Sequence, residues 1–247
     1  GAPGRGPTMP FVHSPEPLDE PRAIREGDMV VVYERHDKMK ALTVDAKKQY
    51  GGSFGQFKMK DWIGKPFGSK VFSHTKNPSH RDGGGQGTGF IFLLDPTPEI
   101  WTSVLPHRTQ ILYAADISAI VTFLDLRPGS VVIETGTGSG SLSHGLIRAV
   151  APTGHLHTFE FHEERCNKAR EEFEEHGLSK HVTCYHRNTE EDGFGEALEG
   201  AVDAVFLDLP GPWRAIPHAA RCLRANGGLC SFSPCIEQVQ KSCLELE

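Results

Sequence analysis

The stretch Val131-Val-Ile-Glu-Thr-Gly-Thr-Gly-Ser-Gly140 decides the fold of this chain. Its apolar start predicts a short buried strand that ends near the carboxylate of Glu134, and Ser141 is placed to cap a helix over 141–148. Three glycines at every second position separate the two elements. A strand that turns through glycines into a helix N-terminus is typical of a nucleotide site in an open α/β sheet, because a ligand can lie against bare backbone there.

The spacing of the glycines indicates which nucleotide is bound. A dinucleotide site needs Gly-x-Gly-x-x-Gly, but the third glycine would fall at Ser141 or Ser143. The pattern present, Glu-x-Gly-x-Gly-x-Gly, resembles the first motif of class I S-adenosylmethionine methyltransferases. Glu160 ends the next predicted strand, twenty residues after the last glycine, where a carboxylate can accept both ribose hydroxyls. The two features together favour the methyl donor.

Composition limits the remaining possibilities. The 247 residues, 38% of them hydrophobic, suffice for one core and a small second domain, and no run of eighteen apolar residues predicts a membrane span. Six cysteines without a Cys-x-x-Cys pair indicate reduced thiols of an intracellular protein. His155 and His157 are spaced like a metal pair, but no third ligand of fitting spacing follows, so we predict no metal site.

Charge is distributed unevenly along the chain. The formal net charge is −6, yet residues 34–81 hold 11 Lys and Arg against 4 Asp and Glu, whereas residues 111–247 hold 11 against 20. A basic N-terminal module attached to an acidic catalytic one is compatible with binding a polyanion at one end. A solvated lysine-rich surface explains the same pattern, and charge alone leaves the two alternatives open.

Hydrophobic periodicity predicts the domain organisation. We expect 1–26 to be a disordered tail or an artificial terminus, 27–100 to be a small all-β, barrel-like domain, and 101–247 to be a doubly wound, Rossmann-like α/β domain. A helix is predicted over 108–126. Strands ending at Glu160, Tyr185, Asp208 and Ser233 then alternate with helices, which indicates a parallel sheet.

Asp208 is the clearest candidate for chemistry. It ends a predicted strand beside the first one and precedes Leu-Pro-Gly-Pro-Trp213. Ligands of doubly wound sheets bind at the carboxyl ends of central strands, and a carboxylate there suits a flat base with an exocyclic amine. The alternative is that Asp208 only caps the turn. Asp203, in the same strand, is predicted to face solvent.

Polar residues elsewhere are candidates for the same rim. Thr109 is predicted to cap the 108–126 helix while Gln110 points to the carboxylate end of the donor, although plain capping and solvation account equally well for both. Asn188 follows the third strand of the sheet, where methyltransferases often hold the adenine amine.

Six longer motifs carry a more specific resemblance. They are similar to those of the catalytic subunits of eukaryotic tRNA (adenine-58-N1) methyltransferase, and the resemblance covers roughly residues 24–243. The motifs lie at Pro106–Tyr113, Glu134–Ser141, Ala151–His157, Asp203–Pro210, Ser231–Gln238 and Gly64–Lys70.

The resemblance implies a function and a set of site residues. It implies methyl transfer from S-adenosylmethionine to N1 of the T-loop adenine of tRNA, with Asp208 as the catalytic carboxylate. The residues expected at the donor, from the glycine motif and the resemblance together, are Gln110, Leu112, Glu134, Gly136, Gly138, Ser139, Gly140, Ser141, Glu160, Arg165, Asn188 and Asp208. The residues expected at the tRNA are Arg35, His36, Lys47, Lys48 and Arg108.

The resemblance also implies partners, and the chain departs from the family pattern in two places. It implies a nuclear heterotetramer of two catalytic and two non-catalytic subunits, in which the partner supplies much of the RNA contact. The family usually has an aspartate where this chain has Asn188, whose amide can still accept from an amine. Class I methyltransferases continue after the fifth strand with an antiparallel strand pair, for which sequence is expected to be missing here.

Two other functions remain as alternatives. One is a different class I methyltransferase, such as an enzyme that repairs isoaspartyl protein, which leaves the basic β module without a purpose. The other is a catalytically silent subunit that only binds tRNA and its partner. Glu160, Asp208 and the three glycines favour the active enzyme.

Overall fold

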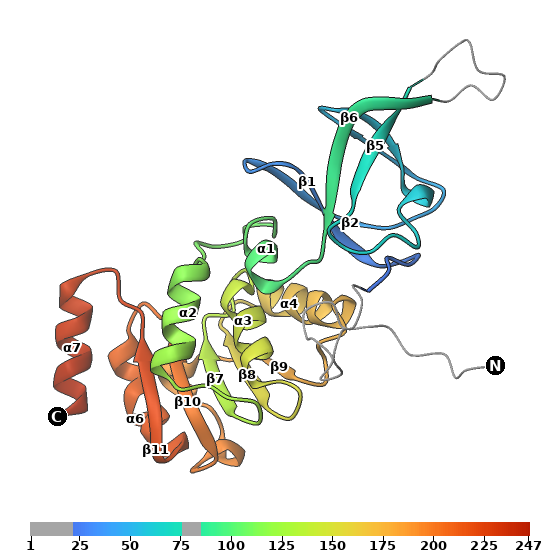
Figure 1. Cartoon of the computed structure of the whole chain (residues 1–247). Helices are drawn as coiled ribbons and strands as arrows, with labels where there is room; N and C mark the ends of the chain where they lie inside the picture. Colours follow the sequence, from blue (N-terminus) through green and yellow to red (C-terminus); the bar gives the residue numbers. More distant parts are fainter. Residues whose placement is uncertain (1–21, 76–84) are drawn as a thin grey trace, which may run out of the picture. The chain divides into compact units, whose positions relative to one another are not determined.

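The computed structural model describes residues 22–75 and 85–247, which form two compact units (Figure 1). Among the described residues, the β unit ends at Leu105 and the α/β unit comprises Pro106–Glu247. The division falls five residues after the predicted boundary. Helix α1 (Pro98–Thr102) belongs to the β unit, and the turn through Leu105 stays attached to it because the amides of Val104 and Leu105 donate to the Trp101 carbonyl.

The β unit is an antiparallel half-barrel, in agreement with the prediction of a small barrel-like β domain. Its sheet has the order β2-β1-β6-β5-β4-β3, with no pairing between β2 and β3 among the described residues. The strands are β1 (Met29–Arg35), β2 (Lys38–Thr43), β3 (Gln49–Gly52), β4 (Gly55–Lys58), β5 (Lys70–Thr75) and β6 (Gly85–Leu94), with a 3-10 turn, η1, at Met59–Asp61.

Alternation along the strands builds the core of the β unit. Val30, Val32 and Leu93 point inward onto Phe57 and Trp62, all of them fully buried. Part of the predicted tail also belongs here. The side chain of Ile24 is buried in this core, and its backbone bonds to both Lys65 and Gly64. Residues 1–21 of the predicted tail lie outside the described residues.

The α/β unit is a parallel five-stranded sheet of order β11-β10-β7-β8-β9. The strand order reverses between β7 and β10, which makes their carboxyl ends the expected ligand crevice of a doubly wound sheet. The central strands are apolar on both faces and fully buried, as at Val132 and Ile133. The strands are β7 (Val131–Thr135), β8 (His155–Glu160), β9 (Val182–His186), β10 (Val202–Leu207) and β11 (Leu223–Ser231).

Helices connect and cover these strands. α3 packs on β7 and β8, α4 on β8 and β9, and α6 on β10 and β11, while α7 lies against α6 (Figure 1). None of the helices in the described parts of the chain is both long and apolar enough to cross a membrane. The helices are α2 (Ala114–Phe123), α3 (Ser141–Val150), α4 (Glu163–Glu175), α5 (Thr189–Asp192), α6 (Pro212–Cys222) and α7 (Ile236–Leu246), with a 3-10 turn, η2, at Glu196–Leu198.

The helix predicted over 108–126 is shorter at its N-terminal end. α2 begins only at Ala114, where the Asp116 carboxylate accepts the Tyr113 amide. The amides of Arg108 and Thr109 both donate to Ser139 Oγ, so they are held against the glycine turn and do not enter a helix. Hydrophobic periodicity does not detect such a competing tertiary hydrogen bond.

Asp203 does not simply face solvent as predicted. Its carboxylate accepts the Val131 amide at 2.7 Å, and Arg224 pairs with its other oxygen. The first residue of β7 is thereby fastened to β10, at the opposite end of the strands from the ligand crevice.

We predict that Asp203→Ala lowers the free energy of unfolding by about 1–2 kcal/mol, because the Val131 amide loses its acceptor. Urea unfolding measures the loss, and faster hydrogen exchange at the Val131 amide locates it. Asp203→Asn is the control, since its amide oxygen still accepts and only an exposed ion pair is lost. Equal losses in both variants would contradict this role.

Candidate functional site

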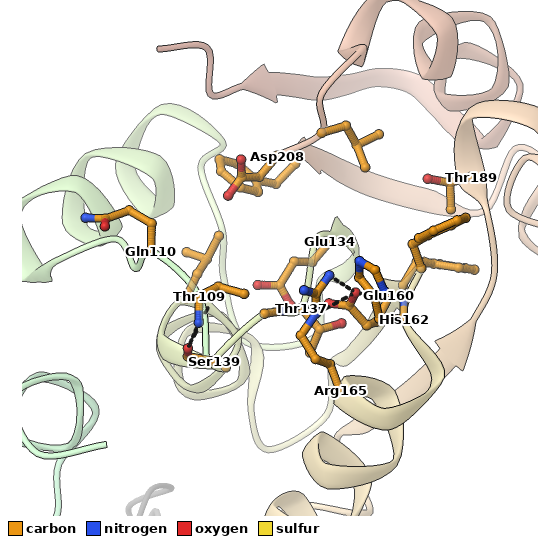
Figure 2. A pocket seen from close by; sticks show the side chains of 18 of the residues that line it. Thr109, Gln110, Glu134, Thr137, Ser139, Glu160, His162, Arg165, Thr189 and Asp208 are labelled. Atoms are coloured by element: carbon orange, nitrogen blue, oxygen red, sulfur yellow. Dashed lines mark hydrogen bonds and ion pairs between the residues drawn. The ribbon is translucent and has the colours of Figure 1, made fainter. Parts of the chain in front are cut away.

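A pocket of about 490 Å³ opens at the carboxyl ends of β7 and β10 (Figure 2). The glycine turn after β7 forms its floor, and segments that follow β8, β9 and β10 form its walls. The predicted donor residues are all brought together here, since each of them lines the pocket. They are Gln110, Leu112, Glu134, Gly136, Gly138, Ser139, Gly140, Ser141, Glu160, Arg165, Asn188 and Asp208.

The glycine turn adopts a conformation that other residues rarely take. Gly136, Gly138 and Gly140 have φ angles of 77°, 53° and 75°. A Cβ on Gly136 would lie 2.5 Å from the Asp208 carbonyl oxygen, and one on Gly138 would lie 2.6 Å from Thr109 Oγ1. The turn is therefore held between β10 on one side and the 108–112 segment on the other, and it leaves its backbone open to the pocket.

Glu160 is a fixed, ionised carboxylate. Gly138 N donates to its Oε2 at 3.0 Å, while His162 N and the Arg165 guanidinium donate to Oε1. Burial acts to raise the pKa of Glu160, but the hydrogen bonds from Arg165, His162 and Gly138 outweigh it and lower the pKa below its ordinary value. A carboxylate has about four lone-pair positions, so acceptor capacity remains for a ligand hydroxyl.

Glu134 has the opposite environment. Its side chain is almost fully buried, and Ser143 Oγ donates a hydrogen bond to it at 2.6 Å. Burial raises the pKa of Glu134 to about 7, because the hydrogen bonds from Ser143 and Thr158 offset the effect of burial only in part and the nearby charges of Asp208 and Glu160 add to the increase. Glu134 therefore takes up or releases a proton near neutral pH.

Asp208 follows the last residue of β10, and its carboxylate faces the pocket from the side opposite Glu160 and Arg165 (Figure 2). Its amide donates to Thr135 Oγ1 at 3.1 Å, which ties the residue to β7. Within the described residues, its carboxylate accepts no hydrogen bond. The mouth of the pocket leaves Asp208 open to solvent, yet the surrounding protein partly desolvates the carboxylate and raises its pKa.

Arg108, Thr109 and Ser139 brace the glycine turn. Ser139 Oγ accepts hydrogen bonds from the backbone amides of Arg108 and Thr109 and lies 3.2 Å from Thr109 Oγ1. Thr109 therefore does not cap a helix, contrary to the prediction. The Arg108 guanidinium donates to the Gly138 carbonyl and forms an ion pair with Glu172 at 2.8 Å. Arg108, predicted to contact tRNA, is thus largely buried and engaged with the turn.

Ser141 also differs from its prediction. The residue that precedes α3 is Gly140, and Ser141 Oγ instead donates to the Leu112 carbonyl at 2.8 Å. This bond holds the 108–112 segment over the pocket. Gly140, Ser141 and Leu142, at the N-terminus of α3, line the pocket, and helix N-termini favour anionic ligand groups.

A buried histidine pair supports the turn from behind. His144 Nδ1 lies 2.6 Å from the Gly140 carbonyl and therefore donates to it, so His144 Nε2 accepts from His176 Nδ1 at 2.8 Å. Burial lowers the pKa of His144 to about 4 and that of His176 to about 3. Both rings are neutral at physiological pH, so His176 donates to His144 and His144 donates to the Gly140 carbonyl.

Asn188 lines the pocket and begins α5. Its Oδ1 accepts the Glu190 amide at 3.2 Å, which leaves one lone pair on that oxygen. Sequence analysis did not single out Phe161, His162, Glu190 or Leu209, although each lines the pocket. Phe161, His162 and Leu209 lie within two residues of a strand end, and this position is the signal that could have indicated them, whereas Glu190 lies in α5.

The remaining predicted residues lie elsewhere. Arg35 is the last residue of β1, and His36, Lys47 and Lys48 lie in the connections between strands of the β unit. All four are exposed, and no described contact joins them to a site. His155 and His157 contact Thr183 and Tyr185 through their ring nitrogens at 2.8 and 3.1 Å. In the described ranges, no group of three or more His, Cys, Asp or Glu side chains gathers as metal ligands do.

A model of the family described as "tRNA methyltransferase complex GCD14 subunit" matches residues 89–247, more than half of the chain. The chain belongs to this family. It is 46% identical over 231 residues to the tRNA (adenine(58)-N(1))-methyltransferase catalytic subunit of Dictyostelium discoideum, which covers 93% of this chain and 70% of that protein. The family resemblance drawn from the six motifs is thereby confirmed.

Other relatives bear similar names. The chain is 45% identical over 228 residues to the TRM61 catalytic subunit of Cryptococcus neoformans and 42% identical over 232 residues to that of Schizosaccharomyces pombe. Each match covers 91% of this chain, which spans 50% of the first protein and 60% of the second.

Two solved structures share the fold. A SAM-dependent O-methyltransferase from Thermotoga maritima superposes with a TM-score of 0.76 at 27% identity, covering 96% of this chain and 82% of the other. The tRNA (m1A58) methyltransferase TrmI from Aquifex aeolicus gives 0.71 at 24% identity, covering 91% and 82%. The predicted fold class, a β domain followed by a Rossmann-like methyltransferase sheet, is confirmed.

The raised pKa of Glu134 predicts a pH-dependent stability. The pKa of Glu134 is about 7 in the folded state and 4.5 in the unfolded state, so between pH 4.5 and pH 7 the folded state binds a proton that the unfolded state has lost. The contribution of Glu134 is therefore greatest below pH 4.5 and is lost as pH rises through 7. Relative to Glu134→Gln, we expect the wild-type chain to lose on the order of 3 kcal/mol of unfolding free energy between pH 5 and 8.

Urea unfolding of both proteins at several pH values measures this difference. The comparison cancels the titration of all groups that the two proteins share. A difference that stays constant with pH would show that Glu134 keeps an ordinary pKa.

Proposed function

We propose that this chain is the catalytic subunit of a tRNA (adenine-58-N1) methyltransferase that uses S-adenosylmethionine. Membership of the family and the names of its relatives support the reaction. The observation that carries the proposal is the open carboxylate of Asp208, which faces a glycine-floored pocket already containing Glu134 and Glu160.

The pocket fits the methyl donor in shape and charge. A side chain at Gly136 or Gly138 would collide with Asp208 or Thr109, so the floor of the pocket is bare backbone that a nucleoside can approach. Glu160, held by Arg165 and the Gly138 amide, is placed to accept ribose hydroxyls. Four carboxyl groups and two guanidinium groups line the pocket, and this excess of acidic groups favours a cationic ligand. When bound, S-adenosylmethionine supplies an electrophilic methyl group on a sulfonium.

Asp208 then has two tasks at the target base. Methylation at N1 makes the adenine cationic unless its exocyclic amine loses a proton, and the Asp208 carboxylate offsets the charge and accepts that proton. Its raised pKa makes it a stronger base than an ordinary aspartate. The base has to leave its stack in the tRNA elbow to reach the pocket.

The rest of the site fixes the geometry. Thr135 Oγ1 accepts the Asp208 amide, and the Asp208 carbonyl packs against Gly136, so the backbone of Asp208 is fixed against the donor floor. Placing N1 in line with the methyl carbon is most of the work in this transfer, since the donor is already activated.

We further propose that the active form is a nuclear heterotetramer of two catalytic and two non-catalytic subunits. The word "subunit" in the family description and the acidic net charge of this chain support a partner that supplies RNA contacts. The stoichiometry and the nuclear location rest on the family resemblance. Native mass spectrometry of the assembled complex tests the first, and imaging of the tagged protein tests the second.

We predict that Asp208→Asn lowers kcat for methyl transfer to unmodified tRNA by at least about 100-fold, the usual scale for loss of a general base. The affinity for S-adenosylhomocysteine is expected to stay within a few-fold, because the donor floor is intact. Labelled methyl transfer and calorimetry measure the two effects in the assembled complex. Asp203→Asn, on the same strand, is the matched control and keeps its turnover.

Retained turnover in Asp208→Asn would exclude the proposed base. A protein that binds no donor would be a silent subunit, and label that enters protein and not tRNA would indicate a methyltransferase of another class. Mapping the label to N1 of the T-loop adenine separates the proposed reaction from other tRNA methylations.

The charge of the pocket predicts a pH-dependent affinity for the donor. A cationic sulfonium favours ionised Glu134, so binding lowers its pKa of about 7 and releases a proton. The affinity for S-adenosylmethionine should therefore rise severalfold between pH 6 and 8. The rise should be smaller for the neutral thioether S-adenosylhomocysteine, and it should vanish in Glu134→Gln. Calorimetry in buffers of different ionisation enthalpy counts the protons released. Equal pH dependence for both ligands would contradict the electrostatic fit.

A further inference from the structure

The outer face of the β unit carries a group of exposed aromatic rings outside the site described above. Phe54, Phe72 and Phe90 are 41%, 36% and 39% exposed, and we call these three rings together with Lys70 the aromatic platform. The rings of Phe54 and Phe90 are nearly parallel, with centroids 6.4 Å apart, and Phe72 meets Phe90 edge-on at 6.1 Å. Lys70 Nζ lies 3.7 Å from the Phe90 ring centroid.

Strand register places two of these rings on the outer face. Phe72 of β5 pairs with Phe90 of β6, and the adjacent pair, Val71 with Ile91, points into the core. Because side chains alternate along a strand, both phenylalanines must face outward as long as the core is intact. Two large apolar rings are therefore exposed side by side at positions that do not contribute to the core.

A buried carboxylate holds the turn that carries Phe54. Glu34 accepts the Ser53 amide at 2.9 Å and the Tyr50 hydroxyl at 2.5 Å, and Lys38 Nζ reaches both the carboxylate and Ser53 Oγ. Burial acts to raise the pKa of Glu34, but the hydrogen bonds from Tyr50, Ser53 and Lys38 lower it to about 2. The carboxylate stays ionised, and the turn before Phe54 stays fixed.

Close backbone contact fixes the turn from the other side. A Cβ on Gly89 would lie 1.8 Å from the Phe54 carbonyl oxygen, so β6 accepts this turn only with glycine at that position. The chain thus uses a buried ionised network and a glycine within a strand, both of which cost stability, to hold a ring that remains exposed. A ring held in this way is preorganised for contact with a partner.

The charge of the β unit and the cation at the platform indicate the chemistry of that partner. Described residues 34–75 include nine Lys and Arg against four Asp and Glu, so this part of the unit is net positive. Lys70 places one of these cations directly against the Phe90 ring. Lysine is depleted in the cores of protein–protein interfaces, whereas aromatic rings beside cations are the usual surface for unpaired nucleobases.

We propose that the aromatic platform stacks unpaired bases of the RNA substrate, with Lys70 placed to contact the adjoining phosphate. This inference rests on the proposed function for the identity of the RNA and extends it by naming the surface. It assigns to the β unit a contact by stacking, which differs from the charged turns at Arg35–His36 and Lys47–Lys48.

The test uses the full-length protein assembled with its partner subunit, and unmodified tRNA transcript as the probe. Phe54→Ala and Phe72→Ala should each raise the Kd and the KM for tRNA about tenfold, the scale of one lost base stack, with kcat within twofold of wild type. Phe54→Tyr keeps a stacking ring and should restore binding. Lys70→Gln should weaken binding less and reduce the dependence of Kd on salt.

Matched controls come from the α/β unit. Phe123→Ala removes a ring that is 84% exposed on α2, and Lys180→Gln removes an exposed charge, and both should leave tRNA affinity unchanged. A tryptophan at the platform gives a direct readout of stacking. The emission of Phe54→Trp should be quenched when tRNA is added, whereas that of Phe123→Trp should not.

Each result separates the possibilities. Unchanged tRNA affinity in Phe54→Ala and Phe72→Ala would overturn the proposal. Weaker subunit assembly at unchanged tRNA affinity would also overturn it and identify a protein interface. If the wild-type complex binds tRNA through the platform but methylates another base, the proposed reaction fails and the stacking surface stands.

Discussion

The contact between Gly136 and the Asp208 carbonyl oxygen is the constraint on which the site depends. β7 and β10 are hydrogen-bonded neighbours at the point where the strand order reverses, and the first turn after β7 has to pass directly over the end of β10. No side chain fits at Gly136, since its Cβ would lie 2.5 Å from that oxygen. The backbone floor of the pocket is therefore in direct contact with the backbone of Asp208, the residue that carries the candidate catalytic carboxylate.

Hydrogen bonds from residues behind the turn hold its conformation. Arg108 holds the Gly138 carbonyl, and the neutral His144 ring holds the Gly140 carbonyl through a one-directional hydrogen bond. Three alternate residues of the turn, Gly136, Gly138 and Gly140, have positive φ, which glycine adopts readily, and these hydrogen bonds fix the turn in one conformation. The 108–112 segment consequently belongs to the glycine turn structurally, although more than twenty residues separate them in sequence.

The sequence was sufficient to predict the fold class, the glycine floor, Glu160 and the position of Asp208, because each follows from strand ends in a parallel sheet. Predictions about single side chains were weaker. Ser141 and Thr109 have the right identity and spacing for helix caps, but Leu112 and Ser139 offer tertiary partners that local patterns do not contain. The prediction for Asp203 fails for the same reason, since its partner at Val131 lies 72 positions away.

Four acids of similar intrinsic pKa line this pocket, and the surroundings of Glu134, Glu160 and Asp208 set the pKa values of these three apart. Glu160 has the Arg165 guanidinium and two backbone amides, so it stays ionised, whereas Glu134 is buried, its hydroxyl partners offset the burial only in part, and it titrates near neutral pH. Asp208 has neither a cation nor a described hydrogen bond to its carboxylate, and burial raises its pKa, which suits the role of proton acceptor proposed for it. Carboxyl groups whose environments shift their pKa values apart divide into groups that bind and groups that react. Here the environment of each acid depends on the strand near whose carboxyl end it lies.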